Sequence, residues 1–416
     1  MSMYEYRNQL GSQCVTVINW PIVLFALVFE ALGEEIKLLL VVFGLLVMTV
    51  RFRADIDLRM PRYVPLLILI IVFGLLSGVL NGQLDQFGIY MFVRDVAYYA
   101  SPFLLWIFGC NIGKVIAEED GFWTTLFAMS AAAAVGTIVV GIANNGIALT
   151  MSSFKANELM IYAVVLFAMP PENWRWRKKH RNAVLFWTVF DAIALVITLS
   201  RTTIICLAVV LVVLAMKSFS HFFRVTIIGI ICVAFVAGSV SLMPVNVTSS
   251  FMDKVANSLD EVSSSGNVWT ESTINQNWRG YEKYCAIRNF NHAGSFTKLF
   301  GNGFGYQLDM GGYSSLVVKG SSGGIPFLHN GYFSVLFKCG MLGLFCLIMF
   351  FALQMVSAFK NWFSSGEYID GLVAGILVCL AFCSYVIEGI FIPSGMYYFT
   401  LPLAMIYGLS LAKARC

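Results

Sequence analysis

The chain has 416 residues, of which 59% are hydrophobic and only 12% are charged. Soluble domains carry roughly 45–50% apolar and about 25% charged residues, so this composition excludes a soluble enzyme, a nucleic-acid-binding protein and a disulfide scaffold. The formal net charge of +4 is too small to indicate a polyanionic partner. Long apolar stretches and a mean hydropathy of +0.78 indicate a protein that crosses a membrane several times.

Apolar runs of about 18–22 residues predict about twelve membrane-spanning helices. The first run has no small-residue cleavage site, so we expect it to remain in the protein as a signal anchor. The expected fold class is therefore an all-α polytopic membrane protein. The spans are expected near 14–33, 36–50, 63–80, 96–114, 121–143, 152–170, 183–200, 202–216, 225–244, 331–356, 371–391 and 394–412.

Lysine and arginine cluster in the links that follow even-numbered spans, so all of these links lie on one side of the membrane. By the positive-inside rule that side is the cytoplasm, and both termini are expected there. The basic residues concerned are Arg51, Arg53, Arg59, Arg62, Arg175, Arg177, Lys178, Lys179, Arg181, Lys217, Arg224, Lys360, Lys413 and Arg415.

The ten cysteines do not suggest a disulfide framework, because most of them lie within apolar runs and only Cys285 falls in the long polar loop. In membrane helices a cysteine is usually a small packing residue. The cysteines within apolar runs include Cys206, Cys232, Cys346, Cys379 and Cys383.

One link is much longer than the others and divides the chain into three parts. Residues 1–244 carry spans one to nine, residues 245–330 form a large loop on the outer side, and residues 331–416 carry the last three spans. The loop is rich in Ser, Gly and Asn, and its charges are balanced. Loops longer than about 15 residues are usually functional or disordered, so we expect the functional site in this loop or beneath it.

The long loop contains two stretches with helical spacing and one glycine-rich stretch. Residues 249–263 predict an amphipathic helix, and residues 278–290 predict a second short helix. The glycine-rich stretch covers 301–324 and matches neither a dinucleotide-binding fingerprint nor a P-loop, because the required strand, helix and Gly-Lys-Ser/Thr are missing. It predicts a loop whose backbone comes close to a ligand or to a second segment of the chain.

His329 differs from the other three histidines, because it lies where a membrane helix begins on the outer side. A neutral imidazole there could accept a proton from a substrate hydroxyl; a hydrogen bond to the loop is the alternative. No second histidine or carboxylate lies nearby at ligand spacing, so no metal site is predicted. His180, His221 and His292 lie in polar links or a turn-like stretch, where no special role is expected.

Arg201 stands between two spans with almost no loop, at the outer membrane boundary. An arginine there either snorkels to the interface or binds an anion such as phosphate through its planar fork of donors. Arg279 and Arg288 are nine positions apart, which on one helix is half a turn out of phase. At most one of them is therefore expected to serve the same cleft. Arg94 and Asp95 are expected to form a local ion pair.

Several of these residues follow one another in a recognisable order along the chain. The order is Arg201, then Arg279, Tyr281 and Tyr284 in the long loop, then Leu-Phe-Gly-Asn-Gly-Phe-Gly at 299–305, and finally His-Asn-Gly-Tyr at 329–332. In this order the chain resembles the O-antigen ligase and Wzy-type O-antigen polymerase superfamily of bacterial membrane glycosyltransferases. The resemblance is best over residues 183–345.

The resemblance implies a GT-C-like fold in the bacterial inner membrane, with the large loop and the active site in the periplasm. It implies a metal-independent, inverting glycosyltransferase that needs no cofactor and uses a glycan linked to undecaprenyl diphosphate. Membrane lipid, the lipid-linked donor and acceptor oligosaccharides and a chain-length regulator would be its partners, with no nucleic acid. By resemblance, the catalytic residues would be His329 and Arg279, the diphosphate would be held by Arg201, Arg279 and Arg288, and the supporting residues would be Asn330, Tyr281 and Tyr332.

Four functions are compatible with this pattern to different degrees. A polymerase, which joins a growing polysaccharide to a lipid-linked repeat unit, is the first hypothesis. A ligase, which moves the finished glycan to the lipid A core, shares the donor chemistry. A flippase or other transporter would show repeated halves and buried midplane charges; no repeat is seen, and Asp191 and Glu388 are the charges noted within spans. A peptidoglycan polymerase is disfavoured by the His329-Asn330 sequence.

Overall fold

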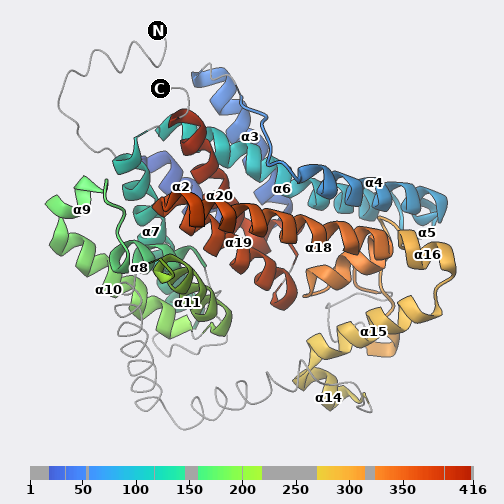
Figure 1. Cartoon of the computed structure of the whole chain (residues 1–416). Helices are drawn as coiled ribbons and strands as arrows, with labels where there is room; N and C mark the ends of the chain where they lie inside the picture. The colour runs from blue at the N-terminus through green and yellow to red at the C-terminus, as the bar shows by residue number, and fades with distance from the viewer. Residues whose placement is uncertain are drawn as a thin grey trace.

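The structure is a computed structural model that describes residues 18–32, 34–52, 56–116, 118–145, 158–198, 200–217, 269–313, 324–387 and 389–413. These ranges are helical apart from short connections, and the single strand-like feature within them is a β-bridge between Leu308 and Ile325. Helix α4 (Val64–Leu80) packs along α18 (Gly331–Ser365), and α6 (Ile89–Ile116) packs along α20 (Pro393–Lys413). Helices α14 to α16 (residues 271–300) lie at one end of the molecule (Figure 1).

The helices follow the predicted apolar runs closely. In chain order they are α2 (Trp20–Ala31), α3 (Glu34–Phe52), α4 (Val64–Leu80), α5 (Gln83–Phe87), α6 (Ile89–Ile116), α7 (Glu119–Asn145), α8 (Ile161–Ala168), α9 (Arg175–Lys179), α10 (Arg181–Thr198), α11 (Arg201–Ala215), α14 (Glu271–Gln276), α15 (Trp278–His292), α16 (Ser295–Phe300), α18 (Gly331–Ser365), α19 (Tyr368–Val386) and α20 (Pro393–Lys413). Short 3-10 turns occur at Glu158–Met160 and Gly311–Tyr313.

Four described helical stretches are long and apolar enough to cross a membrane: Ile89–Ile116, Glu119–Val140, Gly331–Ser365 and Tyr368–Val386. Other apolar helices, among them α4 and α11, are shorter. A helical, multi-pass membrane protein is thus what the described residues show, whereas the number of about twelve spans, the three-part division and the GT-C-like fold remain predictions. The predicted span at 225–244 and the predicted amphipathic helix at 249–263 lie outside the described residues.

Small residues let α6 and α20 pack with their backbones close together. A Cβ atom on Gly113 would lie 1.9 Å from the carbonyl oxygen of Met405, and one on Gly408 would lie 1.9 Å from that of Cys110. Close approach through small residues is a common way for membrane helices to associate, because lipid gives little hydrophobic drive between them. This contact joins the C-terminal helix to the middle of the bundle. The described cysteines in apolar runs, Cys206, Cys346, Cys379 and Cys383, are all buried, as expected for packing residues.

The glycine-rich stretch brings backbone close to a second segment of the chain, which was one of the two expected roles. The N–H groups of Asn302 and Gly303 donate to the carbonyl oxygens of Phe337 and Lys338 in α18, both at 2.9 Å. On its other side the stretch meets α4, where Phe304 N–H donates to Gly74 O at 2.8 Å. Residues 301–305 therefore form a bridge between α4 and α18.

The bridge coincides with a kink in α18. Gly340 has non-helical angles (φ 70°, ψ −169°) inside the helix, so the ladder of backbone hydrogen bonds is interrupted there. The loop N–H groups occupy the carbonyl oxygens of residues 337 and 338, just before the kink. A side chain at Gly340 would lie 2.3 Å from Leu299 O, so the kink and the bridge depend on each other.

We expect Gly303→Ala to destabilise the protein by several kcal/mol. Gly303 has φ +95°, and a Cβ there would lie 2.0 Å from Gly78 N. A strained backbone costs about 1–3 kcal/mol, and overpacking typically adds about 1–3 kcal/mol. Thermal unfolding in detergent measures the loss. Gly294→Ala is the matched control, because nothing lies within 4 Å of its Cβ position. Equal stability of both variants would contradict the bridge.

A buried ion pair holds the bridge in place from inside. Asp95 of α6 and Lys338 of α18 are paired with both side chains fully buried. The same Asp95 oxygen accepts from Gly305 N–H at 2.8 Å, and Lys338 Nζ donates to Tyr306 O at 3.2 Å. Three elements, α6, α18 and the glycine-rich stretch, thus meet at one pair of charges.

The sequence predicted two charges within spans, Asp191 and Glu388, but a third, Lys338, lies within the span expected at 331–356. The expected pair of Arg94 with Asp95 is present at 3.7 Å, but Lys338 is the closer partner of Asp95. Asp191 is buried in α10, where Ser130 Oγ donates to it at 3.4 Å. Glu388 lies outside the described residues.

Candidate active site

Helix α15, predicted from residues 278–290, is confirmed and carries one half of the candidate site. The side chain of Asn277 caps its start and accepts from Gly280 N–H at 3.0 Å. Side chains three and four positions apart share one face of a helix, so Trp278, Arg279 and Glu282 project in similar directions. The helix thus presents an aromatic ring, a cation and a carboxylate together.

Tyr281 fixes α15 to the rest of the loop. Its hydroxyl donates to Met310 O at 2.7 Å, and its ring packs beside Trp269, Tyr284 and Tyr313. Burial raises the pKa of the Tyr281 phenol, so it stays protonated and keeps this hydrogen bond. Tyr281 therefore anchors α15 to the rest of the loop.

The start of α18 carries the other half of the site. Asn330 caps this helix, with its Oδ1 accepting from Phe333 N–H at 3.1 Å. Leu328 N–H donates to Ser334 Oγ at 3.0 Å, which closes the preceding turn. His329 lies between these two fixed residues, so its backbone has little freedom.

Glu282 and His329 form the central contact between the two halves. One carboxylate oxygen of Glu282 accepts from His329 N–H at 2.9 Å, and the other lies 3.3 Å from His329 Nδ1. An ionised carboxylate only accepts hydrogen bonds, so Nδ1 is the donor in this contact, and in a neutral ring Nε2 would then carry the free lone pair. The Glu282 side chain is 3% exposed, whereas that of His329 is 34% exposed. A buried acid thus holds an accessible imidazole, with the Trp278 ring at 4.4 Å in an edge-on contact.

A cavity of about 330 Å³ lies at this contact. Helices α11, α15, α18 and α19 all contribute to its wall, and apolar side chains such as Phe333, Phe382 and Val386 form much of it. Its polar and charged lining residues are Arg201, Thr202, Arg279, Glu282, Lys283, His329, Asn330 and Tyr385. Three cations and several apolar side chains therefore line the same space as His329.

Arg201 enters this cavity as the first residue of α11. Ser200 caps the helix and accepts from Thr203 N–H at 3.3 Å, so Arg201 stands at the helix N-terminus. The helix dipole adds positive potential at that end, which favours an anion there. The guanidinium of Arg201 and the N-terminus of α11 thus both favour an anion at this place.

The structure brings together four of the seven residues predicted for the site: Arg201, Arg279, His329 and Asn330. Arg288 lies elsewhere and lines a separate hollow with His292 and Asp309, as the half-turn argument requires for one of the two arginines. Tyr281 and Tyr332 do not line the cavity, and the Tyr332 hydroxyl donates to Ala381 O at 3.1 Å between α18 and α19.

Glu282 is a charged cavity residue that the sequence prediction missed, whereas Lys283 was considered only as a further basic residue for the diphosphate. A signal for Glu282 was available, because it follows Arg279 by three positions on a predicted helix and so shares its face. Lys283 follows Arg279 by four positions and gives the same signal. Among the residues that the structure describes, no group of three His, Cys, Asp or Glu side chains is arranged to hold a metal ion.

Comparison with known families bears on the same segment. Residues 183–348 match the family model Wzy_C, described as O-antigen ligase. This range includes Arg201, Arg279, Glu282 and His329, and it confirms the resemblance to the O-antigen ligase and polymerase superfamily over nearly the same residues that suggested it. No curated protein matches the chain.

Proposed function

We propose, on the premise that residues 183–348 are an O-antigen ligase-type domain, that the chain transfers a glycan from a lipid-linked diphosphate to an acceptor hydroxyl. Family members are glycosyltransferase-like enzymes, and the family implies lipid-linked glycan substrates. The observation that carries the proposal is the cavity in which the Glu282–His329 pair meets Arg201, Arg279 and Lys283.

The three cations are suited to the donor diphosphate. Guanidinium groups bind phosphate oxygens through paired donors, and their charge stabilises a diphosphate as it leaves. In this proposal Arg201 and Arg279 hold the two phosphates and Lys283 adds a third charge. These residues supply the positive charge that a metal ion supplies in other diphosphate-using enzymes, so the proposed reaction is metal-independent.

His329 is suited to activate the acceptor. Its Nε2 takes the proton of the acceptor hydroxyl while the hydroxyl oxygen bonds to the anomeric carbon of the donor sugar. The bond from that carbon to the diphosphate oxygen breaks with its electron pair, and the lipid diphosphate leaves. One such displacement inverts the anomeric carbon. Glu282 keeps the imidazole oriented and stabilises the imidazolium that forms.

Two acceptors are compatible with the proposed chemistry. Our first proposal is a polymerase, in which the acceptor is a lipid-linked repeat unit and a chain-length regulator is a partner. The second is a ligase, in which the acceptor is the lipid A core; the family match supports both equally. In both, the donor is linked to undecaprenyl diphosphate and the protein lies in the inner membrane with its site facing the periplasm.

The lipopolysaccharide ladder of a strain that lacks this gene tests the proposal. A core that bears one repeat unit means that ligation survives and polymerisation is lost, as a polymerase predicts. Bare core with long polymer left on undecaprenyl diphosphate identifies the ligase. A normal ladder, together with unchanged amounts of every other surface polysaccharide, would contradict both.

Arg279→Ala and Arg288→Ala should separate the cavity from its surroundings. A hydrogen bond to a charged group contributes about 1.5–3 kcal/mol, so loss of Arg279 should slow transfer by roughly 10- to 150-fold at about 1.4 kcal/mol per tenfold. Arg288 lies outside the cavity, so its loss should change the rate only a few-fold. Transfer from a purified lipid-linked donor measures both. Equal losses in the two variants would refute the assignment of Arg279.

A further inference from the structure

The bridge of residues 301–305 lies well inside the ends of the helices that it joins. It meets α4 at Gly74, and α4 continues from there to Leu80. It meets α18 at Lys338, and α18 begins at Gly331. At about 1.5 Å per helical residue, both helices extend roughly 9–10 Å beyond the bridge, on the side where α18 starts.

The helices expose apolar side chains in the part that extends beyond the bridge. Leu76, Val79 and Leu80 are exposed on α4. Ile89 and Val93 are exposed at the start of α6, ahead of the aspartate that binds the bridge. Apolar side chains that point outward from a membrane helix face lipid. The bridge therefore lies at hydrocarbon depth, further into the membrane than these lipid-facing helix ends.

The backbone of the bridge is paired as this depth requires. Hydrocarbon offers no hydrogen-bond partners, so non-helical backbone lies at membrane depth only where the protein satisfies its polar groups. Asn81 Nδ2 donates to the carbonyl oxygens of Gly301 and Asn302, at 3.3 and 3.1 Å. Every N–H group of residues 301–305 donates within the protein, and the acceptors in chain order are Thr297 O, Phe337 O, Lys338 O, Gly74 O and a carboxylate oxygen of Asp95.

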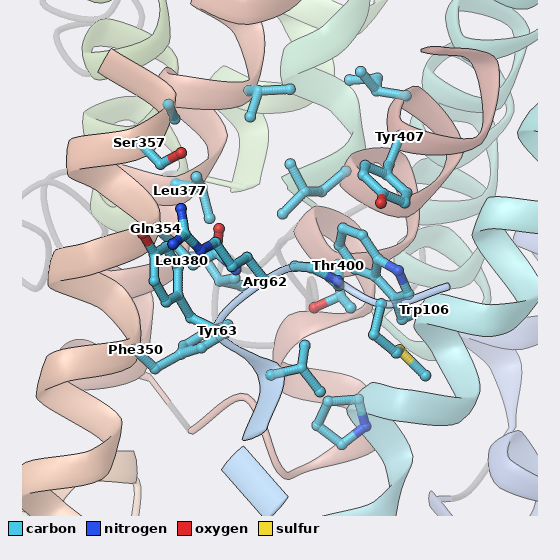
Figure 2. Close-up of a pocket in the computed structure, with 18 of the residues that line it drawn as sticks. Arg62, Tyr63, Trp106, Phe350, Gln354, Ser357, Leu377, Leu380, Thr400 and Tyr407 are labelled. Carbon is cyan, nitrogen blue, oxygen red and sulfur yellow. The ribbon is translucent and has the colours of Figure 1, made fainter. Parts of the chain in front are cut away.

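The bridge also belongs to the interior of the bundle. Phe304 is fully buried, and its ring lies 4.6 Å from that of Tyr99 in α6. Toward the other ends of α4 and α18, the two helices border a cavity of about 440 Å³, with Val64 and Phe350 in its wall (Figure 2). In the half of the bundle near α16, residues 301–305 lie between the same two helices. The stretch thus packs among the spans and does not merely cover their ends.

Helix α16, which leads into the bridge, carries an apolar face that continues the surface of α4. Phe296 and Leu299 are three positions apart, so they share one face of the helix, and both are exposed. The Phe296 ring lies 5.0 Å from that of Phe300. The Phe300 ring in turn lies edge-on to Phe73 of α4, at 5.9 Å. Three aromatic rings therefore connect α16 with the lipid-facing surface of α4.

We propose that residues 295–305 form a re-entrant membrane segment, in which Phe296 and Leu299 contact lipid acyl chains of the leaflet nearest the candidate active site. The long loop of residues 245–330 therefore enters the membrane at α16. Because α16 follows α15 closely, this contact also fixes the end of α15 against the membrane. The inference rests on depth and packing and does not depend on the proposed function.

The full chain in phosphatidylcholine nanodiscs tests the proposal, with trifluoromethyl-phenylalanine placed at one position per sample. Fluorine relaxation by dissolved oxygen, which concentrates in hydrocarbon, is compared with relaxation by a water-soluble nickel chelate. Position Leu76 on α4 is the lipid reference, and position Ser272, exposed on α14, is the water reference. We expect labels at Phe296 and Leu299 to respond more to oxygen than to the chelate, as at Leu76.

Two results would overturn the proposal. One is relaxation by the chelate at Phe296 and Leu299 as strong as at Ser272, which would place α16 in water. The other is protection of both positions from both reagents, which would mean that protein and not lipid covers α16. If the label at Leu299 prevents folding, the label at Phe296, which keeps an aromatic ring, still decides.

Discussion

The His329→Ala protein should insert and fold normally but lose glycan transfer by about 10²–10⁴-fold, the range for removal of a general base. The imidazole is the accessible member of the Glu282–His329 pair and lines the cavity, whereas its backbone N–H, which holds Glu282, survives the change. The protein therefore keeps part of the contact that positions the two halves of the site. Transfer from a lipid-linked donor in proteoliposomes measures the rate.

His292→Ala is the matched control, because His292 lies exposed at the end of α15 and outside the cavity. It should leave the rate unchanged. Glu282→Gln should give an intermediate loss, since glutamine can still accept from His329 N–H but cannot stabilise an imidazolium. If Glu282 acts through His329, its change should also shift the pH dependence of the rate. A His329→Ala enzyme that retains normal transfer would remove His329 from the mechanism.

The second large effect is expected from the buried ion pair. Lys338→Met removes the closer counter-ion of the fully buried Asp95 carboxylate and leaves only Arg94, at 3.7 Å, beside it. Breaking a buried pair typically costs about 3–5 kcal/mol. The loss should appear as a much smaller folded fraction after heating in detergent. It should also release residues 301–305, since Gly305 N–H is held by the same carboxylate.

The double variant Asp95→Asn with Lys338→Met separates charge from packing. It removes both charges, and the asparagine oxygen can still accept from Gly305 N–H. We expect it to recover much of the stability lost in Lys338→Met, because the fully buried carboxylate is gone. A double variant no more stable than Lys338→Met would mean that the contacts of the lysine chain, and not its charge, stabilise the fold.

Local patterns predicted much of what the structure describes. Apolar runs gave the positions of the helices, because burial in lipid or in a bundle demands a continuous apolar stretch. The spacing of Arg279 and Arg288 predicted correctly that both could not serve one cleft, since helix geometry alone decides it. The glycine-rich stretch was correctly expected to approach a second segment closely.

Pairings between distant segments were beyond prediction from one sequence. Asp95 and Lys338 are 243 positions apart, and Glu282 and His329 are 47 apart. Nothing in the composition around Lys338 distinguishes it from a lysine that snorkels to the membrane surface. The kink at Gly340 is equally hidden, because a glycine within an apolar run is also common in straight membrane helices.

The candidate site has a consequence for the order of events during synthesis. Its wall includes Arg201 from before the long loop and Phe382, Tyr385 and Val386 from the penultimate described helix. A growing chain cannot close the cavity until nearly all of its residues have left the ribosome and entered the membrane. The ion pair between Asp95 and Lys338 likewise cannot form until α18 is inserted. Incomplete translation products would therefore have no assembled site, and under the proposed function a truncated copy could not consume lipid-linked donor.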